Sequence, residues 1–395
     1  MSLLNKSTTV AANAGTGDLS SELCALSSEQ KLCALSSEQK LSALSSVAVL
    51  GVSGYAGMEL ARLLLHHPAL AGSPPLFLGR SEAAPEPLAA VHPQLMGNNG
   101  AGPGPDGLRI EPFSWDLVQS RGVKILFLAT PHDQSREWVP QALDHGLRVI
   151  DLSGAWRLTE STNRAVYKFA DEGSAIATQV QTKAVYGMPE LHRDEIRDAA
   201  LVANPGCYAT SIILALKPLL SAGWIDLHHG IVADSKSGVS GAGKAPTAKT
   251  HFMHAADNLS AYGLFSHRHT GELLEQLELA PEQIVFTPHL LPIPRGILST
   301  SYIRFEKPHQ PSDVEALYRS FFAKSPLVRV FPAGQLPEIQ YSVNTNYCDI
   351  GFHLADDGRR CVIVSCLDNL LKGAAGQAVQ NLNLMVGFKE TEGLV

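Results

Sequence analysis

The segment Val47-Ala-Val-Leu-Gly-Val-Ser-Gly-Tyr-Ala-Gly57 decides the fold of this chain. Its apolar start ends in glycine, which predicts a short buried strand, and Met58 to His66 then predict a helix that ends before Pro68. A glycine-rich turn between a strand and a helix lets a pyrophosphate approach the backbone at the helix N-terminus. The spacing is GxxGxxG instead of GxGxxG, so an ordinary strand–helix turn is the alternative. The residues expected at a dinucleotide cofactor are Gly51, Ser53, Gly54, Tyr55, Ala56 and Gly57.

Further apolar runs follow this segment and alternate with helical periods. Buried strands are expected at 76–78, 124–129, 147–151 and 200–203, which predicts a parallel, doubly wound sheet. Strand patterns dominate from about 224 to 365, at 230–233, 283–286, 300–304 and 360–365, and residues 370–385 return to a helical period. We therefore predict an α/β protein with a Rossmann domain over 47–205, completed by 366–395, and an α+β catalytic and dimerisation domain over 206–365.

Composition narrows the class of protein. The 395 residues carry a net charge of −7, and no run of Lys and Arg suggests a nucleic-acid partner. No apolar stretch reaches the roughly 18–20 residues of a membrane helix. The N-terminus has no secretory pattern, and the six cysteines form neither a disulfide framework nor a CxxC zinc pair. We expect a cytoplasmic protein with reduced thiols and no metal.

Residues 1–46 differ from the rest of the chain. A nine-residue unit runs from Leu23 to Lys31, repeats from Leu32 to Lys40 and begins again at Leu41. Two copies are too few for a solenoid core. We interpret the segment as a low-complexity extension, with a docking segment as the alternative.

The second predicted strand ends at Gly79-Arg80-Ser81. An acidic residue at this position would accept from the ribose 2′-hydroxyl and favour NAD. A guanidinium and a hydroxyl suit a 2′-phosphate better, so Arg80 and Ser81 favour NADP(H). The alternative is a solvated surface arginine.

Cys207 is the candidate nucleophile. It follows Asn204-Pro-Gly206 between a predicted strand and a predicted helix, so it should lie at a helix N-terminus. The free N–H groups there stabilise a thiolate and should lower its pKa. The thiolate is the form that attacks a carbonyl carbon.

His267 and His269 flank Arg268 just before a helix expected at 272–277, and either imidazole could act as the acid and base. A zinc site would need a third ligand, and none stands at convincing spacing. For phosphate, residues 235–244 resemble an anion nest that contains Ser240 and Gly241. Arg295, after two prolines, could hold a carboxylate or phosphate.

Together these motifs resemble the N-acetyl-γ-glutamyl-phosphate reductases of arginine biosynthesis. The stretches that carry the resemblance are 51–57, 151–157, 186–190, 204–208, 237–243, 267–269, 292–296 and 368–374. The resemblance implies NADPH, a homodimer or homotetramer, Cys207 as nucleophile and one of the two histidines, for which we favour His269, as acid and base. It places Asn369 near the nicotinamide and makes Ser153 and Arg268 further candidates for contacts with the small-molecule substrate.

Four other functions remain open at this point. Aspartate-semialdehyde dehydrogenases share the layout, and a carrier-bound aminoadipyl phosphate would be a related substrate. A catalytically silent NADP sensor would bind NADPH without turnover. A cysteine hydrolase would turn over without NADPH.

Overall fold

The computed structural model describes residues 47–96 and 107–395, so the predicted N-terminal extension lies outside the described residues. Within the described part, one sheet has eight strands in the order β3-β4-β2-β1-β5-β6-β8-β7. Their bounds are Val47–Leu50 (β1), Leu76–Gly79 (β2), Glu86–Pro87 (β3), Arg109–Pro112 (β4), Ile125–Leu128 (β5), Arg148–Asp151 (β6), Ala184–Tyr186 (β7) and Leu201–Ala203 (β8). Every pair is parallel except β3 with β4.

Helices connect these strands, as expected for a parallel sheet. They are Tyr55–Leu65 (α4), Leu88–Val91 (α5), Trp115–Ser120 (α6), His132–Asp144 (α7), Ser161–Arg164 (α8), Ala175–Gln181 (α9) and Pro189–Asp198 (α10). Helix α4 begins at Tyr55, three residues before the predicted Met58. The glycine turn ends at Gly54, and residues 55–57 already form the first turn of the helix. The strands β1 and β5 are buried along their whole length, because helices cover both faces of the sheet centre.

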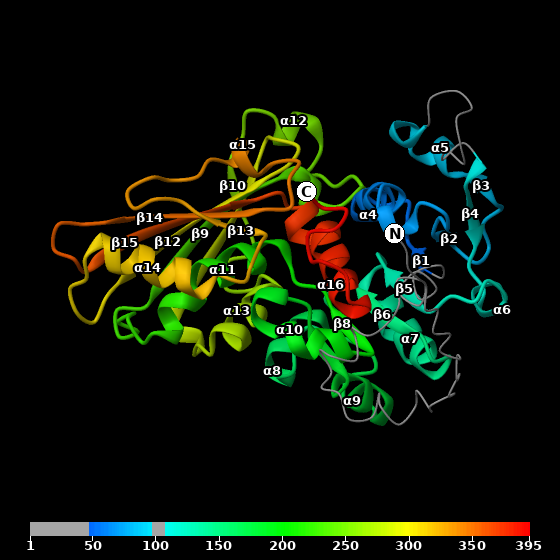
Figure 1. Cartoon of the computed structure of the whole chain (residues 1–395), viewed down its shortest axis with the longest axis horizontal. Coiled ribbons are helices and arrows are strands. Elements are labelled where there is room, and N and C mark those ends of the chain that lie inside the picture. Colours follow the sequence, from blue (N-terminus) through cyan, green and yellow to red (C-terminus); the bar gives the residue numbers. More distant parts are fainter. Residues whose placement is uncertain (1–46, 97–106) are drawn as a thin grey trace, which may run out of the picture.

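A second sheet is mixed, with seven strands in the described residues in the order β10-β11-β9-β12-β15-β14-β13. The strands are Ile231–Gly238 (β9), Ser260–Ala261 (β10), Ile284–Leu291 (β11), Ile297–Arg304 (β12), Val328–Val330 (β13), Cys348–Leu354 (β14) and Arg360–Leu367 (β15). The helices of this half are Cys207–Ser221 (α11), Phe252–Ala255 (α12), Thr270–Leu277 (α13), Pro311–Phe321 (α14) and Ile339–Ser342 (α15). Helices α11, α13 and α14 lie along one side of the sheet (Figure 1).

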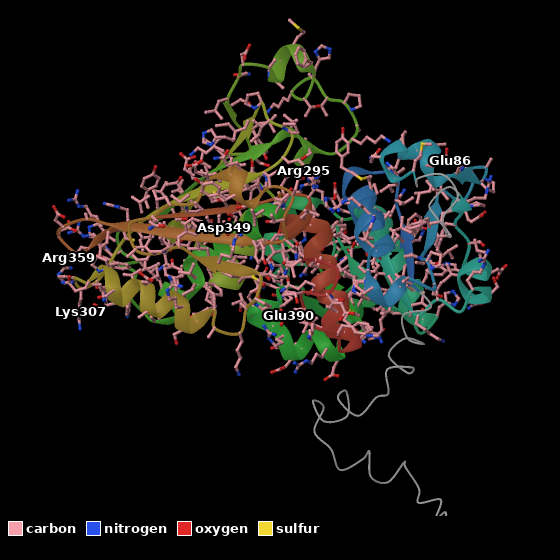
Figure 2. The ribbon with its side chains drawn as sticks, turned by 45° about the horizontal axis from the view of Figure 1, so that its top comes forward. Glu86, Arg295, Lys307, Asp349, Arg359 and Glu390 are labelled. Carbon is pink, nitrogen blue, oxygen red and sulfur yellow. The ribbon has the colours of Figure 1, made fainter. Side chains whose placement is uncertain are left out.

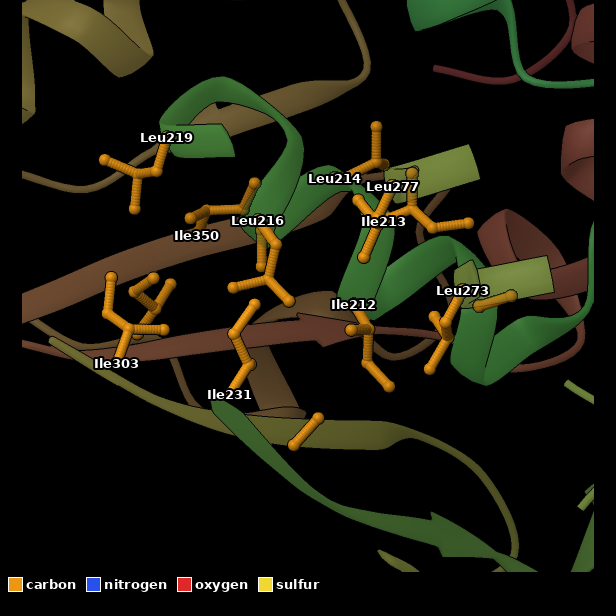
Figure 3. Packing of buried hydrophobic residues seen from close by; sticks show 14 of the residues in the cluster. Ile212, Ile213, Leu214, Leu216, Leu219, Ile231, Leu273, Leu277, Ile303 and Ile350 are labelled. Atoms are coloured by element: carbon orange, nitrogen blue, oxygen red, sulfur yellow. The ribbon is translucent and has the colours of Figure 1, made fainter. Parts of the chain in front are cut away.

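Helix α11 packs its apolar side chains onto the second sheet. Ile212, Ile213 and Leu216 are fully buried in a cluster that includes Ile231 of β9 and Ile350 of β14 (Figure 3). A single fully buried aliphatic side chain contributes about 1.5–3 kcal/mol to stability, so this face fixes the helix firmly. The position of Cys207, the first residue of α11, is therefore set by the core of the second half.

The C-terminal segment returns to the first half, as predicted. A π-helical turn at Leu371–Ala375 leads into Gly376–Val386 (α16), which packs against α4 and α10. In Figure 1 this red helix stands between the two sheets. The segment that follows β15 therefore connects the second sheet directly to the glycine turn.

Candidate active site

The glycine turn fits the pyrophosphate of a dinucleotide. Gly51 has a φ of +90°, and a side-chain carbon there would lie 2.5 Å from the Ala129 carbonyl oxygen. A side-chain carbon at Gly57 would collide with the Gly51 carbonyl oxygen, so α4 can approach β1 only with glycine at this position. Gly54 precedes α4 and offers no side chain to cap it. The first N–H groups of α4 are therefore available to an anionic ligand.

One cavity, of about 320 Å³, joins this turn to the candidate nucleophile, and we call it the glycine-loop cavity. Gly54, Tyr55, Ala56, Gly57, Ser240, Gly241 and Asn369 all line it, as does Cys207. Gly51 lies beneath the turn, where its N–H donates to the Leu78 carbonyl oxygen, and Ser53 is exposed at its tip.

Asn369 is buried and held at both ends of its amide. Its Oδ1 accepts from Gly296 N at 2.7 Å, and its Nδ2 donates to Ser240 Oγ at 2.9 Å. The amide is thus fixed on the cavity wall, beside Gly241. Arg80 and Ser81 are exposed directly after β2, the neighbour of β1, and they remain predicted contacts for the adenosine ribose.

A second cavity, of about 230 Å³, is also lined by Cys207, and we call it the histidine cavity. Its lining includes Thr247, Lys249, Thr250, Tyr262 and His267. The two cavities share four residues, which are Cys207, Gly241, Arg268 and His269. A ligand in either cavity can therefore reach the sulfur atom.

Cys207 begins α11, as predicted, but its acidity differs from the prediction. Burial raises the pKa of the Cys207 thiol to about 11, while the Tyr208 N–H and Arg157 act in the opposite direction. The expectation of a lowered pKa is wrong for the protein without substrate, because loss of hydration outweighs the helix N-terminus. The thiol must therefore transfer its proton to a base before it attacks.

Alkylation of the protein with iodoacetamide should reveal this high pKa. Because the thiolate is the reactive form, we expect the rate at Cys207 to rise continuously from about pH 7 to about pH 10. Mass spectrometry of the peptide that contains Cys207 distinguishes alkylation of this residue from alkylation of the other cysteines. A rate that levels off below about pH 8 would show that the helix N-terminus dominates after all.

The two histidines lie at different distances from the turn before Cys207. His269 packs directly on Gly206, where any side-chain carbon would collide with its Nε2. His267 lies behind it, with the two ring centroids 4.7 Å apart, and its Nδ1 accepts from His269 N at 3.1 Å. Burial and Arg268 lower the pKa of His267 to about 4, and burial with His267 and Arg157 lowers the pKa of His269 well below its usual value. Both rings are neutral at pH 7 and able to accept a proton.

Glu272, which the sequence analysis did not single out, holds the turn before Cys207. It is fully buried at the start of α13, and its Oε2 accepts from Gly206 N at 2.9 Å and from the Tyr186 hydroxyl at 2.6 Å. Its Oε1 accepts from Arg157 Nη1 at 3.0 Å. Arg157 also donates to the Asn204 carbonyl oxygen at 2.7 Å. No sequence pattern indicated these contacts, because the partners lie 66 to 115 residues from Glu272.

Two predicted anion ligands, Ser153 and Arg295, have other partners. Ser153 is buried and donates to Asp151 Oδ2 at 2.7 Å, so it lines neither cavity. Arg295 donates to Glu59 Oε1 at 2.8 Å and to Asp368 Oδ1 at 3.3 Å, and it lies between the two halves of the molecule (Figure 2). The expected anion nest is instead the end of β9 followed by a short turn, because residues 231–238 pair with β11 and β12. Within it, Ser240, Gly241, Gly243 and Lys244 line the glycine-loop cavity, and Ser237, Gly238, Gly241 and Ala242 line the cavity with His267.

Comparisons with known proteins agree with this geometry. Residues 46–199 match the model of the semialdehyde dehydrogenase NAD-binding domain, and residues 207–369 match the semialdehyde dehydrogenase dimerisation domain. The chain is 43% identical to the N-acetyl-γ-glutamyl-phosphate reductase of Desulfotalea psychrophila, over 88% of this chain and 97% of that protein. It belongs to the N-acetyl-γ-glutamyl-phosphate reductase family. The reductase of Moorella thermoacetica is 41% identical over 88% and 96% of the two chains.

Solved structures show the same fold in a neighbouring family. Aspartate semialdehyde dehydrogenase II of Vibrio cholerae, complexed with ASA, aligns over 87% of this reductase-family chain and 98% of its own, with a TM-score of 0.62 and 18% identity. The predicted resemblance and the predicted Rossmann-plus-α+β class are both confirmed. The family assignment also makes the chain an oxidoreductase with a nicotinamide dinucleotide cofactor.

Two features are absent from the described residues. No helix there is long and apolar enough to span a membrane. No group of three or more His, Cys, Asp or Glu side chains in that part of the chain could hold a metal ion.

Proposed function

We propose that this chain converts N-acetyl-γ-glutamyl phosphate to N-acetyl-glutamate 5-semialdehyde and inorganic phosphate, as a step of arginine biosynthesis. The observation that carries the proposal is the meeting of two cavities at Cys207, one lined by the glycine turn and the other by His267 and Tyr262. A thioester on Cys207 would face the cofactor on one side and the rest of the substrate on the other. Reduction of an acyl phosphate by a dinucleotide, the reaction for which the related reductases are named, needs both ligands to meet at one reacting group.

Cys207 carries the covalent steps of the proposed mechanism. Its thiolate attacks the carbonyl carbon of the acyl phosphate, the bond from carbon to the phosphate oxygen breaks, and a thioester forms. The turn at Gly54–Gly57 and Asn369 would hold a nicotinamide dinucleotide in the glycine-loop cavity, where it would supply the hydride for reduction of the thioester. The carbon–sulfur bond of the resulting thiohemiacetal then breaks, which releases the aldehyde and restores the thiolate.

His269 moves the proton in this proposal. Its neutral ring packs on Gly206, next to Cys207, and can accept the thiol proton. The imidazolium can then donate to the substrate oxygen as that oxygen gains negative charge, and it takes the proton back when the carbon–sulfur bond breaks. Glu272 positions both partners, since it holds Gly206 N and lies 4.0 Å from His269 Nε2.

Exchange of the two histidines for asparagine should separate their roles. We expect His269→Asn to lower kcat by about 10²–10⁴-fold, because it removes the base. His267→Asn should lower kcat much less, since this ring supports His269 from behind. Single-turnover kinetics of both variants measure the difference. The reverse order would assign the proton transfer to His267.

The proposal also covers the choice of cofactor, the assembly and the location of the enzyme. Arg80 and Ser81 after β2 support NADP(H) as the cofactor. The matched dimerisation domain supports a homodimer or homotetramer. A biosynthetic role supports a cytoplasmic location.

The test of the function is reduction of NADP⁺ with N-acetyl-glutamate semialdehyde, with and without inorganic phosphate. We expect turnover that requires phosphate and is absent with aspartate semialdehyde. Turnover with the aspartate compound instead would place the substrate in the neighbouring family. Tight NADP binding without turnover on either aldehyde would favour the silent sensor.

A further inference from the structure

The C-terminal segment reaches the candidate nucleophile through the π-helical turn at Leu371–Ala375, which we call the π turn. Backbone hydrogen bonds between residues five apart close it, from Gly373 N to the Asp368 carbonyl oxygen at 2.9 Å and from Ala375 N to the Leu370 carbonyl oxygen at 2.8 Å. Turns of this kind are rare and occur frequently at functional sites. Contacts outside the π turn must therefore favour its geometry over that of an ordinary α-helical turn.

The π turn packs directly on Cys207. A side-chain carbon at Gly373 would lie only 2.7 Å from the Cys207 Cβ, so this close approach needs glycine. Gly373 lines the glycine-loop cavity together with Leu370 and Ala374, and so does Asn369, which lies two residues before the turn. The π turn therefore sets the distance between the sulfur atom and a nicotinamide in that cavity.

A buried lysine anchors the π turn. Lys372 is fully buried, and its Nζ donates to Glu190 Oε1 and to Gln380 Oε1, each at 2.7 Å. Glu190 lies in the first turn of α10 and Gln380 lies in α16, so one ammonium group joins the π turn to two helices. Burial acts to raise the pKa of Glu190, but Lys372 and the hydrogen bonds outweigh it and hold this pKa below its usual value. The ion pair is therefore charged at pH 7.

Further bonds fix the partners of this lysine. Gln380 Nε2 donates to Glu190 Oε1 and to Glu390 Oε2, each at 3.0 Å, and Glu390 pairs with Arg193. Apolar side chains of similar volume often stabilise a protein core as well as a buried ion pair does, so stability alone is a weak reason for these charges. What the directional bonds add is a single allowed position for Lys372, and with it for the π turn.

We propose that the Lys372–Glu190 ion pair is a positioning device for hydride transfer, which holds the π turn so that the carbon bound to Cys207 meets the nicotinamide at reacting distance. The proposal rests on the proposed function for the identity of the reaction. Lys372 and Glu190 are positioning residues, because they act through the turn and through Gly373. A misplacement of about 1 Å at the reacting atoms can lower a rate by about 10²-fold, so a small shift of the turn is enough.

Two variants separate positioning from stability. Lys372→Met leaves the buried Glu190 charge unpaired and should lower the urea midpoint of the full chain. The double variant Lys372→Met with Glu190→Gln removes both charges at nearly constant volume and should restore that midpoint. A role in stability alone predicts that the rate of hydride transfer returns together with the midpoint. A positioning role predicts that this rate stays low.

The burst of NADPH absorbance without inorganic phosphate isolates the hydride step. The Cys207 thiolate adds to the carbonyl carbon of N-acetyl-glutamate semialdehyde, and the resulting thiohemiacetal is oxidised. Its carbon gives the hydride to NADP⁺, and its hydroxyl proton goes to His269. One thioester and one NADPH form per site, and the reaction stops there because no phosphate is present to release the acyl group.

We expect the burst rate to fall about 10²-fold in both variants, while the dissociation constant for NADP⁺ stays within about twofold. An aldehyde deuterated at the carbonyl carbon should show a larger isotope effect on kcat in the variants than in the wild type, because hydride transfer becomes the slow step. The matched control is Lys217→Met, which breaks the ion pair of α11 with Glu278 and should leave the burst rate within about twofold.

A burst rate that recovers in the double variant together with the urea midpoint would overturn the positioning role. A burst rate that is equally low in Lys217→Met would also overturn it, because the loss would then not be specific to the π turn. If the wild type shows no burst with this aldehyde, the proposed function fails, and protection of Cys207 from iodoacetamide by saturating NADP⁺ tests the positioning instead. Weaker protection in the double variant than in the wild type would support the role of the ion pair, and equal protection would refute it.

Discussion

The Cys207→Ser variant should lose more than about 10³-fold in kcat while it still binds NADP⁺. The hydroxyl of serine is far less acidic than a thiol and attacks an acyl phosphate slowly, so the thioester route is closed. The glycine turn leads into α4, and its conformation does not depend on the sulfur atom of Cys207. The affinity for the cofactor should therefore persist. Turnover and fluorescence titration with NADPH measure the two properties.

A matched control for this variant is Cys361→Ser. Cys361 is buried on β15, lines neither cavity and undergoes the same exchange of sulfur for oxygen. We expect its kcat to stay within about twofold of the wild type. If Cys207→Ser retained more than a few per cent of the wild-type activity, the covalent mechanism assigned to Cys207 would be wrong.

Replacement of Glu272 by alanine should have the largest effect on stability. The change leaves the buried Arg157 guanidinium without its counter-charge and takes the acceptor away from Gly206 N and the Tyr186 hydroxyl. Removal of one partner of a buried ion pair costs about 3–5 kcal/mol of unfolding free energy. Urea denaturation of the full chain measures this loss.

Two further variants test whether the loss of stability is specific to the contacts of Glu272. Glu272→Gln keeps an acceptor for Gly206 N and should lose less stability than the alanine variant. Glu282→Ala removes an exposed carboxylate of the same length and should change the unfolding free energy by less than about 0.5 kcal/mol. Equal losses in Glu272→Ala and Glu282→Ala would contradict the role assigned to the Glu272 contacts.

Local chemistry explains why much of the site could be predicted. A strand, a glycine turn and a helix are adjacent in sequence, so the dinucleotide turn at 51–57 could be located without the fold. The same holds for Cys207, because Pro205 and Gly206 end one element directly before the next helix. The histidines at 267 and 269 precede a helix that the apolar spacing also indicated.

Contacts between distant segments explain why the partners of other predicted residues could not be foreseen. Arg295 and Ser153 carry the right groups for an anion, but Glu59, Asp368 and Asp151 occupy them in the folded chain. His132 and Tyr167, which the sequence did not distinguish from surface residues, reach the cavity only because α7 and the segment after β6 fold beside each other.

By itself, the sequence determined the family and the doubly wound first half, and it predicted the cofactor turn and the nucleophile, because each depends on residues that are neighbours along the chain. Only the tertiary structure decided the acidity of Cys207, the network around Glu272 and the contact of Arg268 with His132. These properties depend on burial and on the field of charges from segments far apart in sequence. Neither exists until α11 has packed on the second sheet and the C-terminal segment has returned to the first.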